Sequence, residues 1–208
     1  MDHYGKHILL VTQVNMRHLF IAILLAIVCN VKGQNTIEWD GNYQLKLSDF
    51  QSTATQIGGT NIYSLNTVSS FDFSFYMSSG EFMFTKNFNS KVNCSFNRNA
   101  ASLVAPDSLI ATDLLSFARY QFDLSELYAR KFRKRLFEEK GAFSNVNFFR
   151  PIYDEIQREF NERQTIAMKA TDLGRDKEKL RQIHQDVLAE IAQLANFCKT
   201  CKPPKKKK

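Results

Sequence analysis

Histidine is scarce in this sequence of 208 residues, and its scarcity limits the chemistry open to the protein. The chain has four histidines, at positions 3, 7, 18 and 184, together with four cysteines, eight glycines and four prolines. So few cysteines exclude a disulfide-rich scaffold. The sequence also has no glycine-rich phosphate loop and no internal repeat, which excludes the usual P-loop nucleotide-binding and repeat architectures.

The N-terminal segment has the pattern of an export signal. Residues 16–36 read MRHLFIAILLAIVCNVKGQNT, with a basic start at Arg17 and an unbroken apolar run over residues 19–28. A small residue, Gly33, then precedes Gln34 at the position expected for cleavage. We therefore predict a secretory signal peptide, and the run is shorter than the roughly 20 residues that a membrane span needs. Secretion or residence in the periplasm follows as the expected localisation.

Two alternatives to a cleaved signal stay open. One is a signal anchor that is never cut, and the other is a lipoprotein site at Cys29, which bulky Val28 disfavours. The residues before Met16 look like an upstream extension or a misassigned start. The expected organisation is an extension and signal peptide over 1–33, a single domain over 34–197, and a Cys-x-x-Cys and lysine-rich tail over 198–208.

The basic charge of the chain is concentrated at its C-terminus. The formal net charge is +7, and it falls to +5 once the segment before Gln34 is removed. The segment from Lys199 to the end, the lysine tail, holds six lysines, without which the remaining body is at −1. A basic groove is therefore not expected, and nucleic acid is not an expected partner. Lysine tails are usually solvated, and attraction to an anionic envelope surface is the alternative.

Short alternating patterns in the first half of the mature chain predict strands. Segments 37–50 and 71–77 alternate apolar and polar residues, and Val92, Cys94 and Phe96 share one parity. Segment 81–88 is interpreted as a further strand with three phenylalanines on one face. Together these segments predict an antiparallel sheet with one apolar face.

Helical spacing replaces this alternation in the second half. A helix capped by Asp107 or Ser108 is predicted through about residue 139, a second opens at Pro151, and a third spans about 176–197. The basic run 129–135 is interpreted as a solvated helix face. An antiparallel sheet followed by about three helices indicates an α+β domain.

The first of these helices carries the most specific signal. Residues 114–131 read LLSFARYQFDLSELYARK. This stretch resembles the hallmark L-L-x-H-E-Q-x-H-F-D-[IL]-x-E-[IL]-[YF]-A-R-K of a bacterial domain-of-unknown-function family described as predicted secreted zinc-dependent proteases. The segments LKLSDF (45–50) and TDLG (171–174) are similar to two further family segments. The resemblance implies a zincin-like fold.

The residues that the resemblance assigns to zinc chemistry are missing. A zinc peptidase of this type needs two histidines one helical turn apart and a glutamate that takes a proton from the metal-bound water. Phe117, Ala118 and Gln121 stand at those three positions, and Leu173 stands where the resemblance places a further histidine. With one histidine after the predicted cleavage point, the mature chain cannot build a two-histidine zinc centre. We expect no cofactor and no zinc peptidase activity.

The cysteines leave two structural alternatives open. Cys198 and Cys201 have the spacing of a local disulfide, which an exported setting favours. The same pair is a weak candidate for a structural zinc site with Cys94 and His184. If Cys94 is not a zinc ligand, we interpret it as a small buried hydrophobic residue, because it lies on the apolar face of its predicted strand.

These observations predict an exported pseudo-metallopeptidase that binds a peptide or a partner protein in the bacterial envelope. One alternative is a working hydrolase that uses non-standard residues. Another is a structural envelope component attached through the lysine tail. No transmembrane span is expected after removal of the signal.

Overall fold

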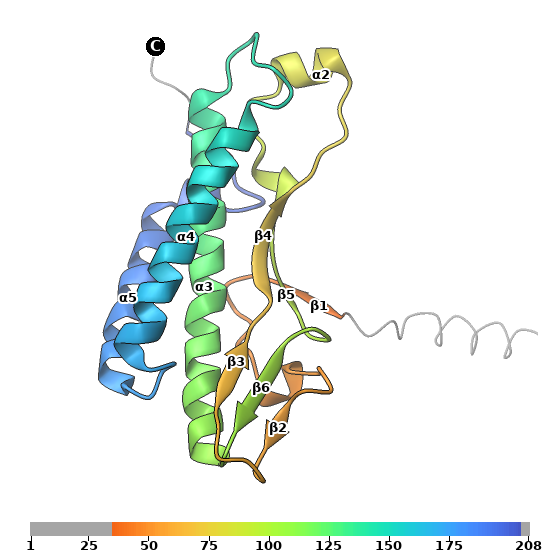
Figure 1. The fold of residues 1–208 in the computed structure, drawn as a ribbon. Coiled ribbons are helices and arrows are strands. Elements are labelled where there is room, and N and C mark those ends of the chain that lie inside the picture. The colour runs from red at the N-terminus through yellow and green to blue at the C-terminus, as the bar shows by residue number, and fades with distance from the viewer. Residues whose placement is uncertain (1–34, 205–208) are drawn as a thin grey trace, which may run out of the picture. The chain divides into compact units, whose positions relative to one another are not determined.

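The computed structural model describes residues 35–204. Its strands are β1 (Thr36–Glu38), β2 (Gln56–Ile57), β3 (Ser64–Asn66), β4 (Ser69–Phe73), β5 (Val92–Asn97) and β6 (Ser102–Ala105). Its α-helices are α2 (Ser79–Phe84), α3 (Ser108–Glu139), α4 (Phe149–Thr171) and α5 (Lys177–Gln193), with 3₁₀ turns at Leu47–Asp49, Asn89–Lys91 and Ala195–Phe197. The strands come before the three long helices, so the fold class is α+β as predicted (Figure 1).

The strands form two small sheets rather than one antiparallel sheet. The order in the first sheet is β1-β5-β4, with both pairs antiparallel, and the order in the second is β2-β6-β3. β2 pairs with β6 in parallel, so the second sheet is mixed and the prediction of a purely antiparallel sheet is wrong for it. Of the strand expected over 37–50, only the start forms, within β1 (Thr36–Glu38). Farther along, Leu47–Asp49 makes a 3₁₀ turn, which the Asp49 carboxylate stabilises by accepting the backbone N–H of Lys46.

The segment predicted as a strand over 81–88 begins as a helix. The Ser78 hydroxyl accepts the backbone N–H of Glu81 and caps α2, which ends at Phe84. Phe82 is buried on one side of this short helix, whereas Met83 and Phe84 are exposed. The alternating aromatic residues suggested a strand, but alternation over so few residues does not exclude a turn and a half of helix.

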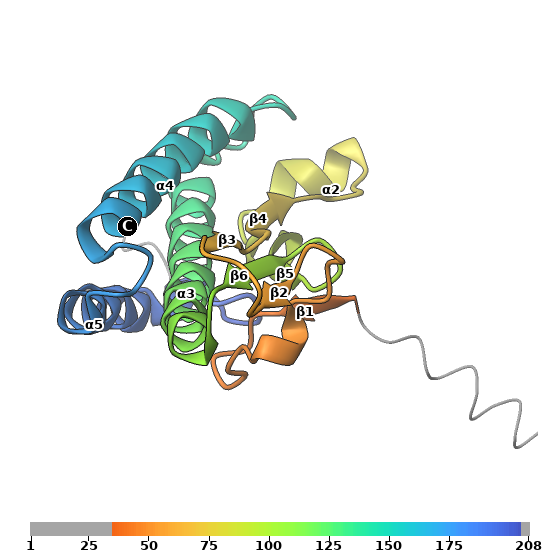
Figure 2. The same ribbon diagram turned by 60° about the horizontal axis from the view of Figure 1, so that its bottom comes forward.

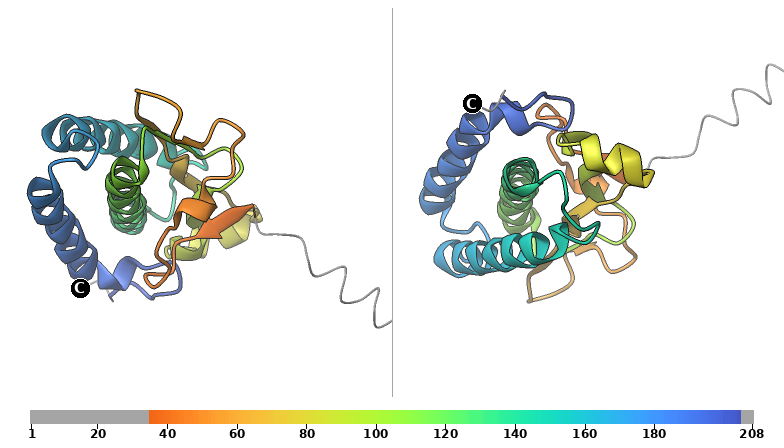
Figure 3. Two further views of the ribbon diagram at one scale, coloured as in Figure 1. Left: turned by 90° about the horizontal axis from the view of Figure 1, so that it is seen from below. Right: turned by 90° about the horizontal axis from the view of Figure 1, so that it is seen from above.

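Helix α3 is the central element of the fold. Asp107 caps it by accepting the backbone N–H of Ile110, and its buried positions extend from Ala111 to Leu136. α4, α5, β4, β5 and β6 all pack against it. Figure 2 shows α4 and α5 on one side of α3 and the strands on the other, and the end-on views of Figure 3 show α3 enclosed between them. A helix covered all round buries polar as well as apolar side chains, which positions the site described below.

Aromatic side chains from both halves fill the space between α3 and the first sheet. Phe71 of β4 lies with its ring centroid 5.9 Å from Phe160 of α4, and Phe73 lies 5.6 Å from Phe132 of α3. Val92, Cys94 and Phe96 all face this core from β5, as their shared parity predicted. The core belongs entirely to the compact unit that begins at Asn35. Within residues 35–204, none of the helices is both long and apolar enough to cross a membrane.

The chain continues to pack beyond the boundary expected at residue 197. The segment Ala195–Cys201, here named the C-terminal hook, crosses back from α5 toward β5. The Asn89 side chain donates to the carbonyls of Asn196 and Cys201 at 3.2 and 3.0 Å. Lys199 also forms an ion pair with Glu38 of β1. The hook is therefore part of the domain.

Candidate functional site

The positions that the resemblance assigns to zinc chemistry lie in the interior of α3. Phe117 and Ala118 have no exposed surface, and Gln121 is 5% exposed. The Gln121 side-chain oxygen accepts the hydroxyl of Thr67 at 2.9 Å, from the connection between β3 and β4. The Gln121 amide oxygen is thus already bonded, and the aromatic ring of Phe117 offers no donor atom.

The turn between α4 and α5 brings the fourth of these positions to the same helix. Leu173 has a φ of 55°, and Gly174 has a φ of 95°. A Cβ on residue 174 would lie 2.5 Å from the backbone oxygen of Asp113 and 3.1 Å from the Cβ of Phe117. Only glycine lets the turn approach α3 so closely. The turn that carries Leu173 therefore meets α3 beside Phe117, and Leu173 itself packs against the hydrophobic core.

Asp123 links three segments that are distant in the sequence. Its Oδ1 accepts the indole N–H of Trp39 at 2.7 Å, and its Oδ2 lies 2.7 Å from Nε2 of His184 on α5. The carboxylate fixes the imidazole proton on Nε2, because a carboxylate can only accept. The His184 ring also packs edge-on against Tyr120, with centroids 5.8 Å apart. Sequence reasoning missed this pair, since 61 residues separate Asp123 from His184.

A pocket of about 430 Å³ opens next to this pair, between the N-terminal halves of α3 and α5. Its lining residues are Gln44, Thr112, Asp113, Ser116, Arg119, Gly174, Lys177, Leu180, Arg181 and His184. Most of its charged groups are cationic. Lys177 pairs with Asp113 at 3.0 Å, and Arg181 pairs with Glu178 outside the lining. The N-terminus of α5, which begins at Lys177, is capped by the Asp176 carboxylate, which accepts the backbone N–H of Lys179.

Arg119 is the cation in this lining that is least neutralised. Its Nε donates to the backbone oxygen of Leu45 at 2.9 Å, and it forms no ion pair with a carboxylate in residues 35–204. The side chain is half-buried, so its remaining N–H donors are held in place beside the pocket. A fixed guanidinium with free donors is suited to a carboxylate or phosphate group.

A serine lies in the same lining but is not activated as a nucleophile. The Ser116 hydroxyl donates to the backbone oxygen of Thr112 at 2.9 Å, and no hydrogen bond joins it to His184 in the described structure. Nucleophilic catalysis by serine needs a base within hydrogen-bonding reach. The Asp123–His184 pair orients an imidazole beside the pocket, but the arrangement lacks an activated nucleophile.

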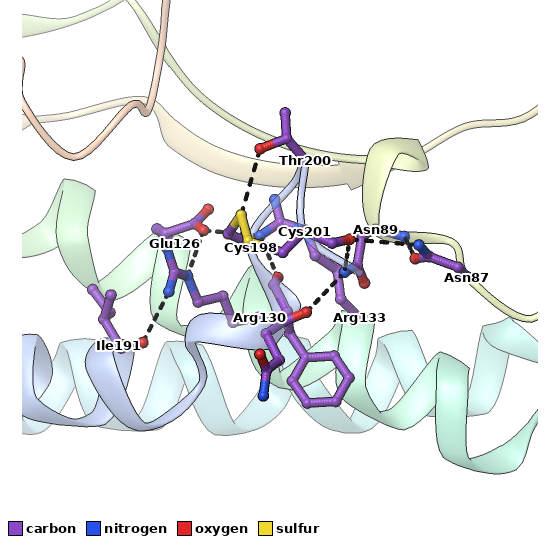
Figure 4. Close-up of a disulfide and its surroundings, with 11 residues drawn as sticks. Asn87, Asn89, Glu126, Arg130, Arg133, Ile191, Cys198, Thr200 and Cys201 are labelled. Atoms are coloured by element: carbon purple, nitrogen blue, oxygen red, sulfur yellow. Dashed lines mark hydrogen bonds and ion pairs between the residues drawn. A yellow bond between two sulfur atoms is a disulfide. The ribbon is translucent and has the colours of Figure 1, made fainter. Parts of the chain in front are cut away.

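Farther along α3, the same stretch of sequence supplies a buried ion cluster, defined as Glu126, Arg130 and Arg133. Glu126 Oε1 lies 2.8 Å from both Arg130 Nε and Arg133 Nη1, and all three side chains are less than 10% exposed. Figure 4 shows the cluster next to the C-terminal hook. The basic run 129–135 was expected to be a solvated face, and for Arg130 and Arg133 this expectation is wrong.

The buried ion cluster binds the last part of the chain to the body of the domain. Arg130 Nη1 donates to the carbonyl of Ile191 at the end of α5. Arg133 donates to the carbonyl of Phe197 in the hook and to that of Val92 on β5. The Arg130 guanidinium also lies 5.3 Å from the ring centroid of Trp39. The cluster therefore satisfies backbone carbonyls at the point where α3, α5, β5 and the hook meet.

A second ionic group joins the three long helices. Glu190 of α5 pairs with Arg163 of α4 at 2.7 Å and with Lys131 of α3 at 3.3 Å. Burial raises the pKa of Glu190, but bonding to Arg163 and Lys131 outweighs it, so its pKa is lowered overall. Burial raises the pKa of Tyr120, on the same side of α3, to about 12.

The cysteines pair as a local disulfide. Cys198 and Cys201 are joined, with their Cα atoms 5.0 Å apart, and the bond closes the end of the hook (Figure 4). Cys94 is free and fully buried, and burial raises the pKa of its thiol well above the ordinary value. The alternative of a zinc site from Cys94, His184, Cys198 and Cys201 is not assembled, since two of its sulfurs are consumed and no metal-binding group of His, Cys, Asp or Glu gathers in residues 35–204.

Comparison with known proteins found no counterpart: no protein-family model, curated protein or solved structure matches this chain. The interpretation of the site therefore depends on its own geometry. In that geometry, four charged residues shared with the hallmark contact α5 or the hook: Asp123 through His184, Glu126 and Arg130 through the buried ion cluster, and Lys131 through Glu190.

Proposed function

We propose that the mature chain is an exported, non-catalytic binding protein built on a zincin-like α+β frame. The observation that carries the proposal is the complete burial of Phe117 at the position of the first histidine of the hallmark. An aromatic ring packed there fills the place where a metal and its water would be held, and Ala118 beside it cannot accept a proton. A protein of this fold that lacks the metal can still bind a peptide or a partner protein through its surface.

The pocket between α3 and α5 is the proposed binding site, and the bound group is an acidic one on a peptide or a partner protein. Arg119 supports this choice, because its guanidinium is fixed by Leu45 and is not neutralised by a carboxylate in the described residues. Lys177 and Arg181 also line the pocket, each paired with a carboxylate, and the pocket is large enough for a short side chain or a chain terminus.

Metal analysis and a peptide-cleavage assay test the absence of catalysis. The purified protein from Gln34 onward is expected to contain no stoichiometric zinc and to leave unstructured peptides uncut when zinc is added. Stoichiometric zinc accompanied by cleavage would refute the proposal.

A second experiment tests the zincin-like frame. The variant that combines Phe117→His, Gln121→His and Leu173→His would place three imidazoles at the presumed ligand positions. We expect its melting temperature to rise on addition of zinc, and to rise more than that of the control Phe117→His/Gln121→His, which keeps Leu173. A folded triple variant that zinc does not stabilise would contradict the frame.

Binding is measured by calorimetry with short acidic peptides, prepared with a free C-terminal carboxylate and with an amide. Arg119→Gln is expected to weaken binding of the free acid at least tenfold, since a charge-assisted hydrogen bond contributes about 1.5–3 kcal/mol. Arg158→Gln, on the exposed face of α4, is the matched control. Equal affinities of wild type and Arg119→Gln would exclude this pocket as the site.

A hydrolase that uses other residues is the alternative, and the Asp123–His184 pair is the observation that favours it. An imidazole oriented by a carboxylate at a pocket wall is a general base in many enzymes. Any cleavage by wild type that His184→Gln abolishes and Leu109→Ser leaves intact would establish this alternative.

A further inference from the structure

Two pairs of side chains between α3 and α5 mark the ends of the pocket. Asp113 pairs with Lys177 at 3.0 Å at one end, and Asp123 pairs with His184 at 2.7 Å at the other. The order of these pairs shows that α3 and α5, which lie side by side, run in the same direction (Figure 3). From Asp113 to Asp123, α3 rises by about 15 Å. The pocket is therefore a groove with the span of about four extended residues.

Arg119 supplies a hydrogen-bond donor near one end of this groove. It lies one helical turn before Asp123 on the same face of α3, so its side chain belongs to the end that holds His184. Its Nε is bonded to the backbone oxygen of Leu45, whereas its two Nη atoms have no hydrogen bond within residues 35–204 and are not buried. Both Nη atoms can therefore donate to an anionic group in the groove.

His184 supplies a hydrogen-bond acceptor at the same end. Because Nε2 donates its proton to the Asp123 carboxylate, the neutral ring carries a lone pair on Nδ1. Nδ1 has no hydrogen bond in the described part of the chain and is not buried, and 23% of the His184 side chain is exposed. The ring is part of the groove lining, so this acceptor is open to a ligand.

A donor and an acceptor held side by side select among acidic ligands. The carboxylate of an aspartate or glutamate side chain would use the donor alone. The last residue of a peptide would use both, because its carboxylate accepts and its own backbone N–H, only two bonds from the carboxylate carbon, donates.

From this pairing we propose that the groove binds the C-terminal residue of a peptide. Arg119 holds the terminal carboxylate, Nδ1 of His184 accepts the last backbone N–H, and the preceding residues extend toward Lys177. Asp123 is a positioning residue, since it acts by keeping the imidazole proton on Nε2. The inference rests on the proposed binding function of this pocket and specifies its ligand.

Calorimetry with three acetylated tetrapeptides tests this inference on the chain from Gln34 onward, which contains the whole compact unit. The first peptide has a free C-terminal carboxylate and no other acid. The second is amidated and contains an aspartate. The third is a depsipeptide, in which an ester oxygen replaces the last backbone N–H and the carboxylate is kept. At about pH 8, where an unperturbed imidazole is neutral, we expect the first to bind most tightly. The amidated peptide should bind at least tenfold more weakly and the depsipeptide about fivefold more weakly.

Two variants determine whether the effect of the ester depends on Nδ1. His184→Gln places an amide near the position of Nε2, so it can still bond to Asp123 but lacks the acceptor. Asp123→Asn can donate to Nε2, which moves the imidazole proton to Nδ1 and turns the acceptor into a donor. In both variants the peptide and the depsipeptide should bind equally. Arg119→Gln, and the control Gln182→Ala on the exposed face of α5, should keep the fivefold difference. Melting curves verify that each variant is folded.

The wild-type protein alone can refute the inference. Equal binding of the peptide and the depsipeptide, or equally tight binding of the amidated peptide, would overturn it while leaving Arg119 as a site for acidic groups. A fivefold difference that persists in His184→Gln would overturn the role of Nδ1. Absence of binding by all three peptides would overturn both this inference and the proposed function on which it rests.

Discussion

The buried ion cluster allows a sharp prediction for the variant Glu126→Gln. Glutamine keeps the shape of the side chain but removes the single negative charge that lies 2.8 Å from both Arg130 and Arg133. Two guanidinium groups would then be buried without a counter-charge. Removal of one partner from a buried ion pair costs about 3–5 kcal/mol, against a total stability of about 5–15 kcal/mol for a domain. For a domain of this size the loss corresponds to a fall in melting temperature of roughly 6–20 °C.

Thermal and urea unfolding, followed by circular dichroism, measure this loss. Glu138→Gln is the matched control, because Glu138 pairs with Lys134 on the same helix while its side chain is 44% exposed. That variant should change the free energy of unfolding by less than about 1 kcal/mol. Combining Glu126→Gln with Arg130→Met should cost less than the sum of the two single changes, because the second removes one of the uncompensated charges. Equal losses for Glu126→Gln and Glu138→Gln would refute the assigned role of the cluster.

Three further outcomes follow from individual contacts. Gly174→Ala should lower the free energy of unfolding by about 2–3 kcal/mol, because its Cβ would clash with Asp113 and its φ is unfavourable, whereas Gly80→Ala, with open space around it, should not. The pKa of Glu190 is below its ordinary value of 4.5, so its ion pairs stabilise the fold above that pH, and this contribution is lost as the pH falls through the lowered pKa. Glu190→Gln should therefore be less stable than wild type at neutral pH. In acid-unfolding curves the difference in stability between the two proteins should vanish. Replacement of Cys198 and Cys201 by serine should cost about 2 kcal/mol or less, because the closed loop is short; a larger loss on thermal unfolding would show that the disulfide also holds the hook in place.

Local signals in the sequence predicted the parts of the fold that depend on local physics. The helix start at Asp107 and the buried parity of β5 each follow from a cap or an alternation within a few residues. The division into two sheets depends on which distant strands pair, and β2 joins β6 in parallel across about 50 residues of chain, which no local pattern records.

The candidate site shows the same division. The residue types at Phe117, Ala118 and Gln121 could be read from the sequence, and the prediction that they hold no zinc follows from ligand chemistry alone. The bond between Asp123 and His184 could not be read from it, because it forms only when α5 packs on α3. Likewise, a run of basic residues on a helix is usually solvated, and the burial of Arg133 is set by the hook and β5 arriving from elsewhere in the chain.

The hallmark-like helix thus contains two sets of positions with different physical tasks. At the positions that the resemblance assigns to zinc, Phe117 packs in the core and Gln121 hydrogen-bonds to Thr67, and burial of an aromatic ring there stabilises the fold. Asp123, Glu126 and Arg130 cannot change as freely, because each is bonded to a group that would otherwise be buried without a partner. The buried charges of this helix therefore hold α5 and the hook against α3, and this structural task accounts for them without catalysis.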